Sequence, residues 1–163
     1  MKIFKRILIF LLVILIVLQA FRTPKNSSGD MTKDISKSYI VPPDVKVILA
    51  KACNDCHSNN TRYPWYAEVQ PVSWWLGGHI KDGKRHLNFS EFDGYRIARQ
   101  YQKLEECIKE VKEGGMPLPS YLIIHKDAVL TDAEKTALYN WCDILRDTIK
   151  ATYPADSLVI KKK

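Results

Sequence analysis

Away from its two ends, the chain has almost no excess of charge of either sign. It carries 25 Lys and Arg residues against 18 Asp and Glu residues. Six of the basic residues lie within positions 1–6 and 161–163, which leaves 19 basic residues against the same 18 acidic ones. The sequence also lacks a basic stripe interleaved with aromatic residues, which a groove that follows phosphates would need. Nucleic acid is therefore excluded as a partner.

A second absence is that of β-strand patterning. From Pro42 onward, no segment alternates apolar and polar residues, and the apolar residues recur every three or four positions instead. This is the period of an α-helix. The sequence therefore predicts an all-α fold for the domain over residues 42–153, whose length of about 110 residues is usual for one domain.

One expected helix precedes the middle of this domain, and a second follows it. The first starts near Asp44, after two prolines, and brings Cys53 to its end. The second follows the apolar positions of 97–111, behind the residues SEFD at 90–93, which have the layout of a capping-box variant. The pair Gly114-Gly115 is expected to end it.

The third expected helix follows the residues TDAE at 131–134, which form a second capping box. The dipeptide Tyr153-Pro154 should end this helix. Its predicted apolar face consists of Ala137, Leu138, Trp141, Ile144, Leu145 and Thr148.

The segment 57–90 is too long for an ordinary connection between helices in so small a domain. A short helix over 71–83 is expected there, weakened by glycines, within a stretch that is otherwise irregular. The segment is also rich in Tyr and Trp. A large, flat, apolar cofactor would give these aromatic side chains a surface to pack on.

The start of the chain is basic and then apolar. Three basic residues precede an uncharged run over residues 7–18, which is the pattern of an export signal. Cleavage is disfavoured because Leu18 occupies a position where a small residue is needed before a cut after Ala20. As a helix, residues 7–21 would span about 22 Å, short of a hydrocarbon core of roughly 30 Å. No cysteine follows the run, so a bacterial lipid anchor is excluded.

An uncleaved anchor is favoured over a cleaved signal peptide, and the basic start places the domain outside the cytoplasm. Residues 22–41 are polar, with scattered Pro, Gly and Ser, which is typical of a flexible tether. The chain then divides into a signal anchor or signal peptide, a tether, the helical domain and a basic tail, over residues 1–21, 22–41, 42–153 and 154–163.

Cysteine is scarce, and the spacing of the four cysteines excludes two of the three chemistries that use closely spaced Cys and His. Cys53, Cys56 and His57 form a C-x-x-C-H motif, whereas Cys107 and Cys142 are far apart. A structural zinc site needs a second close pair of ligands, which is missing. A thioredoxin-like dithiol opens a helix after a strand, whereas this pair closes a helix.

The remaining chemistry is covalent haem attachment, which accounts for every position of the motif. Two thiols one helical turn apart can form thioethers with the two vinyl groups of a haem. The next residue, His57, is then placed to bind the iron as the proximal ligand. The export signal fits, because this attachment is made outside the cytoplasm.

Methionine is also scarce, and only Met116 lies within the domain. It follows the expected helix end at Gly114-Gly115 and precedes Pro117, so it sits in a stiff loop. A thioether ligand raises the reduction potential relative to a second histidine. Met116 is therefore the predicted distal iron ligand, and His79 is the alternative. His86 is expected to be structural or solvated, and His125 to be a hydrogen-bonded residue of the core or of the haem edge.

Cys107 and Cys142 lie on the flanks of the two long predicted helices, which should pack together. In an oxidising compartment they can form a disulfide. Two buried free thiols are the alternative.

Three blocks of the sequence, CNDCHSNNTRYPWY, PVSWWLGGHIKDGKRHLNFSEF and GGMPLPSYLIIHKDAVLTDAEKTALYNWC, resemble the haem-binding domain family of small exported cytochrome-c-like proteins. The resemblance covers roughly residues 40–150. It implies a cytochrome-c-like helical fold around one covalent haem c, held by Cys53 and Cys56 with His57 as axial ligand. Met116 falls where the Met-Pro ligand loop of single-haem cytochromes c would lie.

The expected function is that of a monohaem c-type cytochrome, tethered to the membrane, that carries single electrons. Its place would be the periplasmic side of the bacterial cytoplasmic membrane, or the periplasm if the signal is cleaved. Redox proteins would be its partners, and no enzymatic activity is favoured. A haem enzyme with peroxidase-like chemistry and a haem-based sensor are the alternatives.

Overall fold

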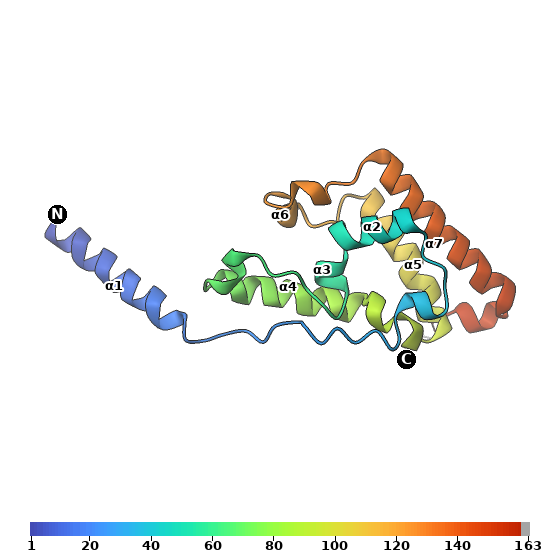
Figure 1. Ribbon diagram of the computed structural model, residues 1–163, viewed down its shortest axis with the longest axis horizontal. Helices are drawn as coiled ribbons and strands as arrows, with labels where there is room; N and C mark the ends of the chain where they lie inside the picture. Colours follow the sequence, from blue (N-terminus) through green and yellow to red (C-terminus); the bar gives the residue numbers. More distant parts are fainter. Residues whose placement is uncertain (161–163) are drawn as a thin grey trace.

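The computed structural model describes residues 1–160, and within that range it contains helices and no strands (Figure 1). The all-α prediction is confirmed. The α-helices are α1 (Lys2–Leu18), α2 (Pro43–Ala52), α3 (Asn54–His57), α4 (Val72–His86), α5 (Ile97–Lys112), α6 (Pro119–Leu122) and α7 (Asp132–Thr152). Short 3₁₀ helices are η1 (Ile35–Lys37), η2 (Trp65–Glu68), η3 (Phe89–Gly94), η4 (Lys126–Ala128) and η5 (Ala155–Leu158).

The core lies where α5 and α7 pack against each other, with α2 laid across α7 (Figure 1). The buried apolar face of α5 is the predicted one, and it includes Leu104, Ile108 and Val111. The face of α7 is rotated from the prediction, since Ile144 is 63 % exposed while Ile149 is buried. The buried side chains of α7 are Leu138, Trp141, Cys142, Leu145 and Ile149.

One of the two expected capping boxes is present. At the start of α7, the Thr131 hydroxyl accepts a hydrogen bond from the backbone N–H of Glu134, and the Glu134 carboxylate accepts one from the Thr131 N–H. The box expected at SEFD is wrong. Ser90 lies in η3, and α5 begins only at Ile97. The reason is packing, because the phenylalanines of η3 are buried in the core.

The middle of the domain is more regular than expected. Residues 72–86 form α4, a helix of 15 residues that contains three glycines and packs against α3. Helix propensity disfavours glycine, but tertiary contacts outweigh propensity. Gly83 shows why, since a Cβ there would lie 2.8 Å from the carbonyl oxygen of Cys56.

The N-terminal helix α1 points away from the domain and buries none of its residues (Figure 1). Its side chains are almost all apolar after the first basic turn. Within residues 1–160, no helix combines the length and the hydropathy that crossing a bilayer requires.

The segment 22–41 differs from the expected flexible tether, because it lies along the domain as an extended strap (Figure 1). Asn26 donates hydrogen bonds to Ser58 and Thr61, and Ser27 forms an isolated bridge with Asn60. Ile35 is 2 % exposed and belongs to the core. These contacts explain the order, because Asn26 and Ser27 find partners in the domain that composition alone does not reveal.

The tail expected over 154–163 begins with η5, which contacts α5. Its basic end, residues 161–163, lies outside the described residues.

Candidate functional site

The C-x-x-C-H motif lies at the turn between α2 and α3. Cys53 ends α2, and its carbonyl oxygen accepts hydrogen bonds from the N–H groups of Cys56 (3.1 Å) and His57 (2.9 Å). This single helical turn brings all three side chains to the wall of one cavity. The motif therefore forms one side of a candidate site.

The cavity has a volume of about 370 Å³ and a predominantly apolar lining. Helix α3 forms one wall, the second half of α4 another, and α5 with the loop after it a third. Besides the motif, the lining includes His79, Gly83, His86, Leu87, Phe89, Lys103, Cys107, Val111, Met116, Pro117, Leu118 and Tyr121. A flat apolar group fits such a lining better than a hydrated ion does.

His57 has one ring nitrogen in use and the other free. Its Nδ1 lies 2.8 Å from the carbonyl oxygen of Leu87. Because a carbonyl only accepts, Nδ1 carries the hydrogen, and Nε2 keeps a lone pair for a metal. Burial lowers the pKa of His57, while the backbone of Leu87 and Gly83 acts in the opposite direction. The ring is thus held neutral, in the state that binds iron.

The two thiols of the motif are held protonated. Burial raises the pKa of Cys53 well above its usual value, and burial also raises that of Cys56 to about 11. A structural zinc site holds its cysteines as thiolates, whereas addition to a vinyl group consumes the hydrogen of an S–H group. Both thiols of the motif carry that hydrogen.

The two predicted candidates for the distal ligand, Met116 and His79, both line this cavity. Met116 lies in the loop after α5, where its N–H donates to the carbonyl of Glu110 (3.1 Å) and Gly114 has φ +75°. His79 lies on α4, with its ring edge to face with Trp75 at 4.4 Å between centroids. The structure thus brings both candidates to the same cavity as His57.

His86 also lines the cavity, where a solvated or structural residue was expected. The signal for it was the spacing of His79, Gly83 and His86 at i, i+4 and i+7. This spacing places all three on one face of a helix. The helix predicted over 71–83 ends before His86, so His86 was not placed on the same face as His79.

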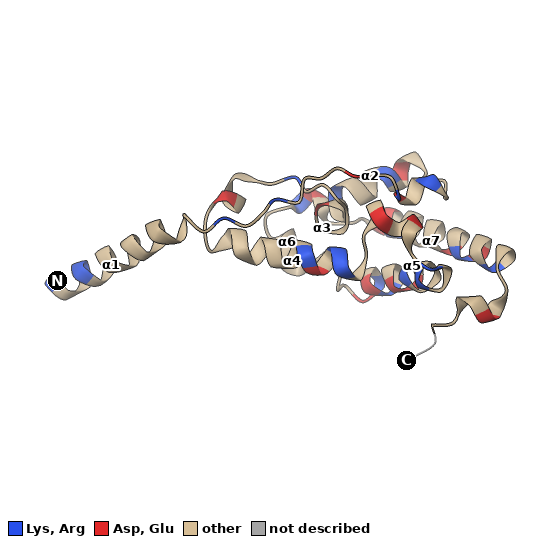
Figure 2. Cartoon of the chain, turned by 90° about the horizontal axis from the view of Figure 1, so that it is seen from below, with Lys and Arg blue, Asp and Glu red and all other residues tan. Residues whose placement is uncertain are grey.

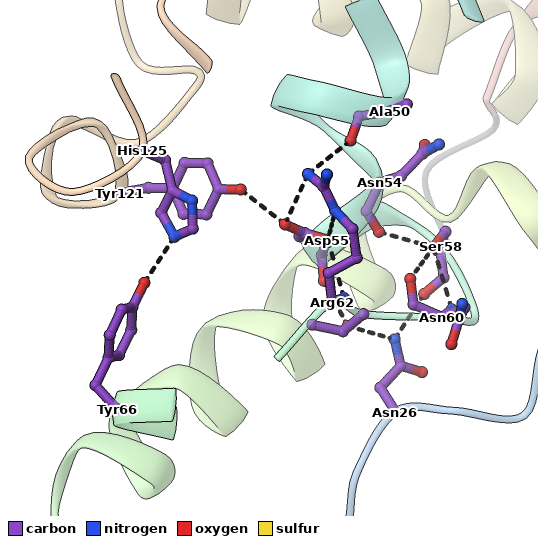
Figure 3. A network of polar contacts seen from close by, with 11 residues as sticks. Asn26, Ala50, Asn54, Asp55, Ser58, Asn60, Arg62, Tyr66, Tyr121 and His125 are labelled. Carbon is purple, nitrogen blue, oxygen red and sulfur yellow. Dashed lines mark hydrogen bonds and ion pairs between the residues drawn. The ribbon is translucent and has the colours of Figure 1, made fainter. Parts of the chain in front are cut away.

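Asp55, between the two cysteines, organises the outer side of the motif (Figure 3). It accepts a hydrogen bond from the Tyr121 hydroxyl (2.8 Å) and forms an ion pair with Arg62 (3.3 Å). Burial and the Asp55 contact raise the pKa of Tyr121, so its hydroxyl stays protonated and donates. Because Tyr121 follows the Met116 loop, this network joins the loop to the motif. The sequence carries no signal for this network, since Asp55 occupies a variable position of the motif and Tyr121 lies 66 residues away.

His125 is hydrogen-bonded, as expected, but it does not line this cavity. Its Nε2 lies 2.7 Å from the Tyr66 hydroxyl, and its ring stacks on that of Tyr121 with centroids 4.0 Å apart (Figure 3).

The four cysteines are free in this structure. Cys107 on α5 and Cys142 on α7 are nevertheless neighbours that influence each other's pKa. A hydrogen bond with Cys142 lowers the pKa of Cys107, and a hydrogen bond with Cys107, followed by burial, raises the pKa of Cys142. Cys107 also lines the cavity. The predicted pair is thus brought together, next to the candidate site.

In the part of the chain that the structure describes, no group of three or more His, Cys, Asp and Glu side chains is arranged to hold a metal ion by itself. The site instead offers two thiols, the neutral imidazole of His57 and a thioether around an apolar cavity. These groups fit a haem, whose porphyrin supplies the remaining iron ligands. Fold and site together define a small helical haem-binding protein.

The comparison with known families agrees with this class. A family model described as a haem-binding domain matches residues 13–144. The chain therefore belongs to the haem-binding domain family. No curated protein and no solved structure matches it.

Proposed function

We propose that this protein is a monohaem c-type cytochrome that carries single electrons outside the cytoplasmic membrane. The observation that carries the proposal is the placement of both thiols and the free Nε2 of His57 on the wall of one apolar cavity. A haem held there would supply a one-electron ferric/ferrous couple.

Cys53 and Cys56 would hold the haem covalently. Each S–H adds across one vinyl group, so a carbon–sulfur bond forms, the hydrogen moves to carbon and no atom leaves. The raised pKa of each thiol keeps that hydrogen in place until the addition. Covalent attachment suits a cavity of about 370 Å³ that stays partly open on one side.

His57 and Met116 would bind the iron on its two faces. Leu87 fixes the orientation of the His57 ring, and the Glu110 carbonyl fixes the backbone of Met116. A histidine–methionine pair gives a higher potential than two histidines. His79 remains the alternative to Met116, because it lines the same cavity.

The apolar helix α1 would anchor the chain in the membrane, with the domain on the periplasmic side. Its support is chemical, since α1 buries none of its residues, is apolar over residues 7–18 and has three basic residues among its first five. Redox proteins are the proposed partners. The apolar lining and the prearranged ligands favour electron transfer over an enzyme that keeps an iron position open.

The test is to produce the full chain in a bacterium that matures c-type haem and to denature it. We expect one haem to remain with the denatured chain and Cys53 and Cys56 to resist alkylation. Cys53→Ser and Cys56→Ser should each lose one thioether, while Cys142→Ser, a matched control, keeps both. A colourless protein, or haem that washes out of the denatured wild type, would overturn the proposal. A high-spin ferric form that binds peroxide would favour the enzyme.

A further inference from the structure

Three of the four tryptophans lie at one end of the domain. Trp65, Trp74 and Trp75 are 80 %, 41 % and 52 % exposed, and Val69 beside them is 40 % exposed. The fourth, Trp141, is in the core. We call the group Trp65, Val69, Trp74 and Trp75 the tryptophan end. An exposed cluster of apolar side chains marks an interaction site, and exposed tryptophan is characteristic of the lipid headgroup layer.

The apolar helix α1 leaves the domain from this same end (Figure 1). Phe21, three residues after α1, accepts hydrogen bonds at its carbonyl from Trp74 Nε1 (3.0 Å) and Gln70 Nε2 (2.7 Å). The N–H of Gln70, a fully buried residue, donates to the Gln19 side chain (2.9 Å). The junction between helix and domain is therefore held in place.

The distribution of charge agrees with a contact between this end of the domain and lipid. Residues 7–18 of α1 and the first half of α4 carry no Lys, Arg, Asp or Glu, whereas the second half of α4 carries several (Figure 2). The charged residues nearest the junction, Arg22, Lys25 and Glu68, form ion pairs across it, in which both basic side chains contact Glu68. A surface with few charges beside an apolar helix is suited to a lipid layer.

The length of α1 also favours a contact between the tryptophan end and the membrane interface. Its 17 residues span about 26 Å at roughly 1.5 Å per residue, a few ångströms less than a hydrocarbon core of about 30 Å. A helix shorter than the core draws its flanking residues toward the interface. Here the flanking residues are Phe21 and the tryptophan end, whose Trp74 donates a hydrogen bond to the carbonyl of Phe21.

We propose that the tryptophan end rests in the headgroup layer of the membrane that holds α1. The inference rests on the anchor proposed above and adds an orientation to it. The strap 22–41 is bonded along the domain, so the domain does not swing on a free tether. The haem cavity is therefore held at a fixed distance from the lipid, and redox partners reach it from the membrane plane or from the faces that point away from it.

The test uses the full, haem-loaded chain in phosphatidylcholine vesicles, with a nitroxide label at Val69→Cys or, as control, at Ile144→Cys on the exposed side of α7. The iron is kept ferrous and diamagnetic. Collision of the label with oxygen, which partitions into lipid, is compared with collision with a water-soluble nickel complex. We expect the oxygen-to-nickel ratio at position 69 to be several-fold higher than at position 144. The unsubstituted chain, treated with the same label, measures how much label the native cysteines take up.

Trp65→Ser, made in the Val69→Cys chain, should lower this ratio toward that of position 144 and leave the haem spectrum unchanged. If the chain binds vesicles with its haem attached but the oxygen-to-nickel ratio at position 69 equals that at position 144, the proposed orientation is wrong. The cytochrome proposal would still stand. If Trp65→Ser leaves the ratio at position 69 unchanged, the tryptophans do not hold this end in the headgroup layer. A chain that does not bind vesicles would overturn the anchor and the inference with it.

Discussion

The Nδ1 atom of His57 lies 2.8 Å from the carbonyl oxygen of Leu87, at the residue that follows α4. A histidine that binds a metal usually donates its other N–H to such an oxygen, which fixes the ring and its tautomer. Here the acceptor belongs to the backbone, so the orientation of the ring depends on how α4 packs against the motif and not on another side chain.

The first prediction concerns His57 itself. His57→Gly removes the proximal ligand but keeps both thiols, so we expect covalent haem with a high-spin spectrum. Millimolar imidazole should enter the vacated space and restore the low-spin spectrum, because the cavity wall that held the ring remains. His125→Gly, outside the cavity, is the control and should keep the wild-type spectrum. A His57→Gly protein that is low-spin without imidazole would show that another residue is the ligand.

The second prediction separates the two candidates for the opposite face. In Met116→Ala we expect the sulfur-to-iron charge-transfer band to disappear and the reduction potential to fall, because a soft thioether ligand that favours ferrous iron is lost. His79→Ala should keep both properties. Optical spectra and a redox titration of the two variants, measured side by side, decide between them. If His79→Ala loses its low-spin signature and Met116→Ala does not, His79 is the ligand.

Sequence patterns predicted the parts of this structure that depend on neighbouring residues. The TDAE box starts α7 because its two partners are three residues apart and need nothing else. The SEFD box failed because Phe89 and Phe92 gain more from burial in the core than a helix start at Ser90 would provide. His86 was missed for a related reason, since the length of α4 depends on its packing against α3.

The strap and the Asp55 network could not be found in this way. Asn26 and Ser58 are hydrogen-bonded across a separation of 32 residues, and Asp55 and Tyr121 across 66. Such pairs depend on the whole fold, and polar composition alone is equally typical of a free tether. The C-x-x-C-H motif was easier to interpret, because its chemistry lies within one helical turn.

The third prediction concerns Cys107 and Cys142. The two thiols are neighbours, and Cys142 lowers the pKa of Cys107, which favours the thiolate that thiol–disulfide exchange needs. In protein matured outside the cytoplasm we expect them to form a disulfide, with a mass lower by two hydrogens than that of the reduced chain. Closing a loop of this length should raise the free energy of unfolding by about 3–4 kcal/mol in the chain-entropy account.

The measurement is a urea titration with and without a phosphine reductant. The wild type should lose stability on reduction, and a chain with Cys107→Ala and Cys142→Val should not respond. Mass spectrometry that finds two alkylated cysteines in the untreated holoprotein would favour the buried free thiols instead.

The fourth prediction uses two glycines of α4 as a matched pair. A Cβ at Gly83 would lie 2.8 Å from the Cys56 carbonyl oxygen and 3.1 Å from its Cβ, whereas nothing lies within 4 Å of a Cβ at Gly78. Gly83→Ala must therefore push α4 away from the motif, at a cost of about 1–3 kcal/mol of stability. Gly78→Ala removes a weak helix former without a clash and should stabilise the protein by about 0.5–1 kcal/mol.

The two variants also test how the site is built. Leu87, which orients His57, directly follows α4, so a displaced helix moves the acceptor of the Nδ1 hydrogen. We expect Gly83→Ala to mature with less haem and a perturbed proximal ligand, and Gly78→Ala to match the wild type in both. Haem content per chain and the low-spin spectrum measure the effect. Equal haem content in both variants would mean that the motif binds its cofactor without the close approach of α4.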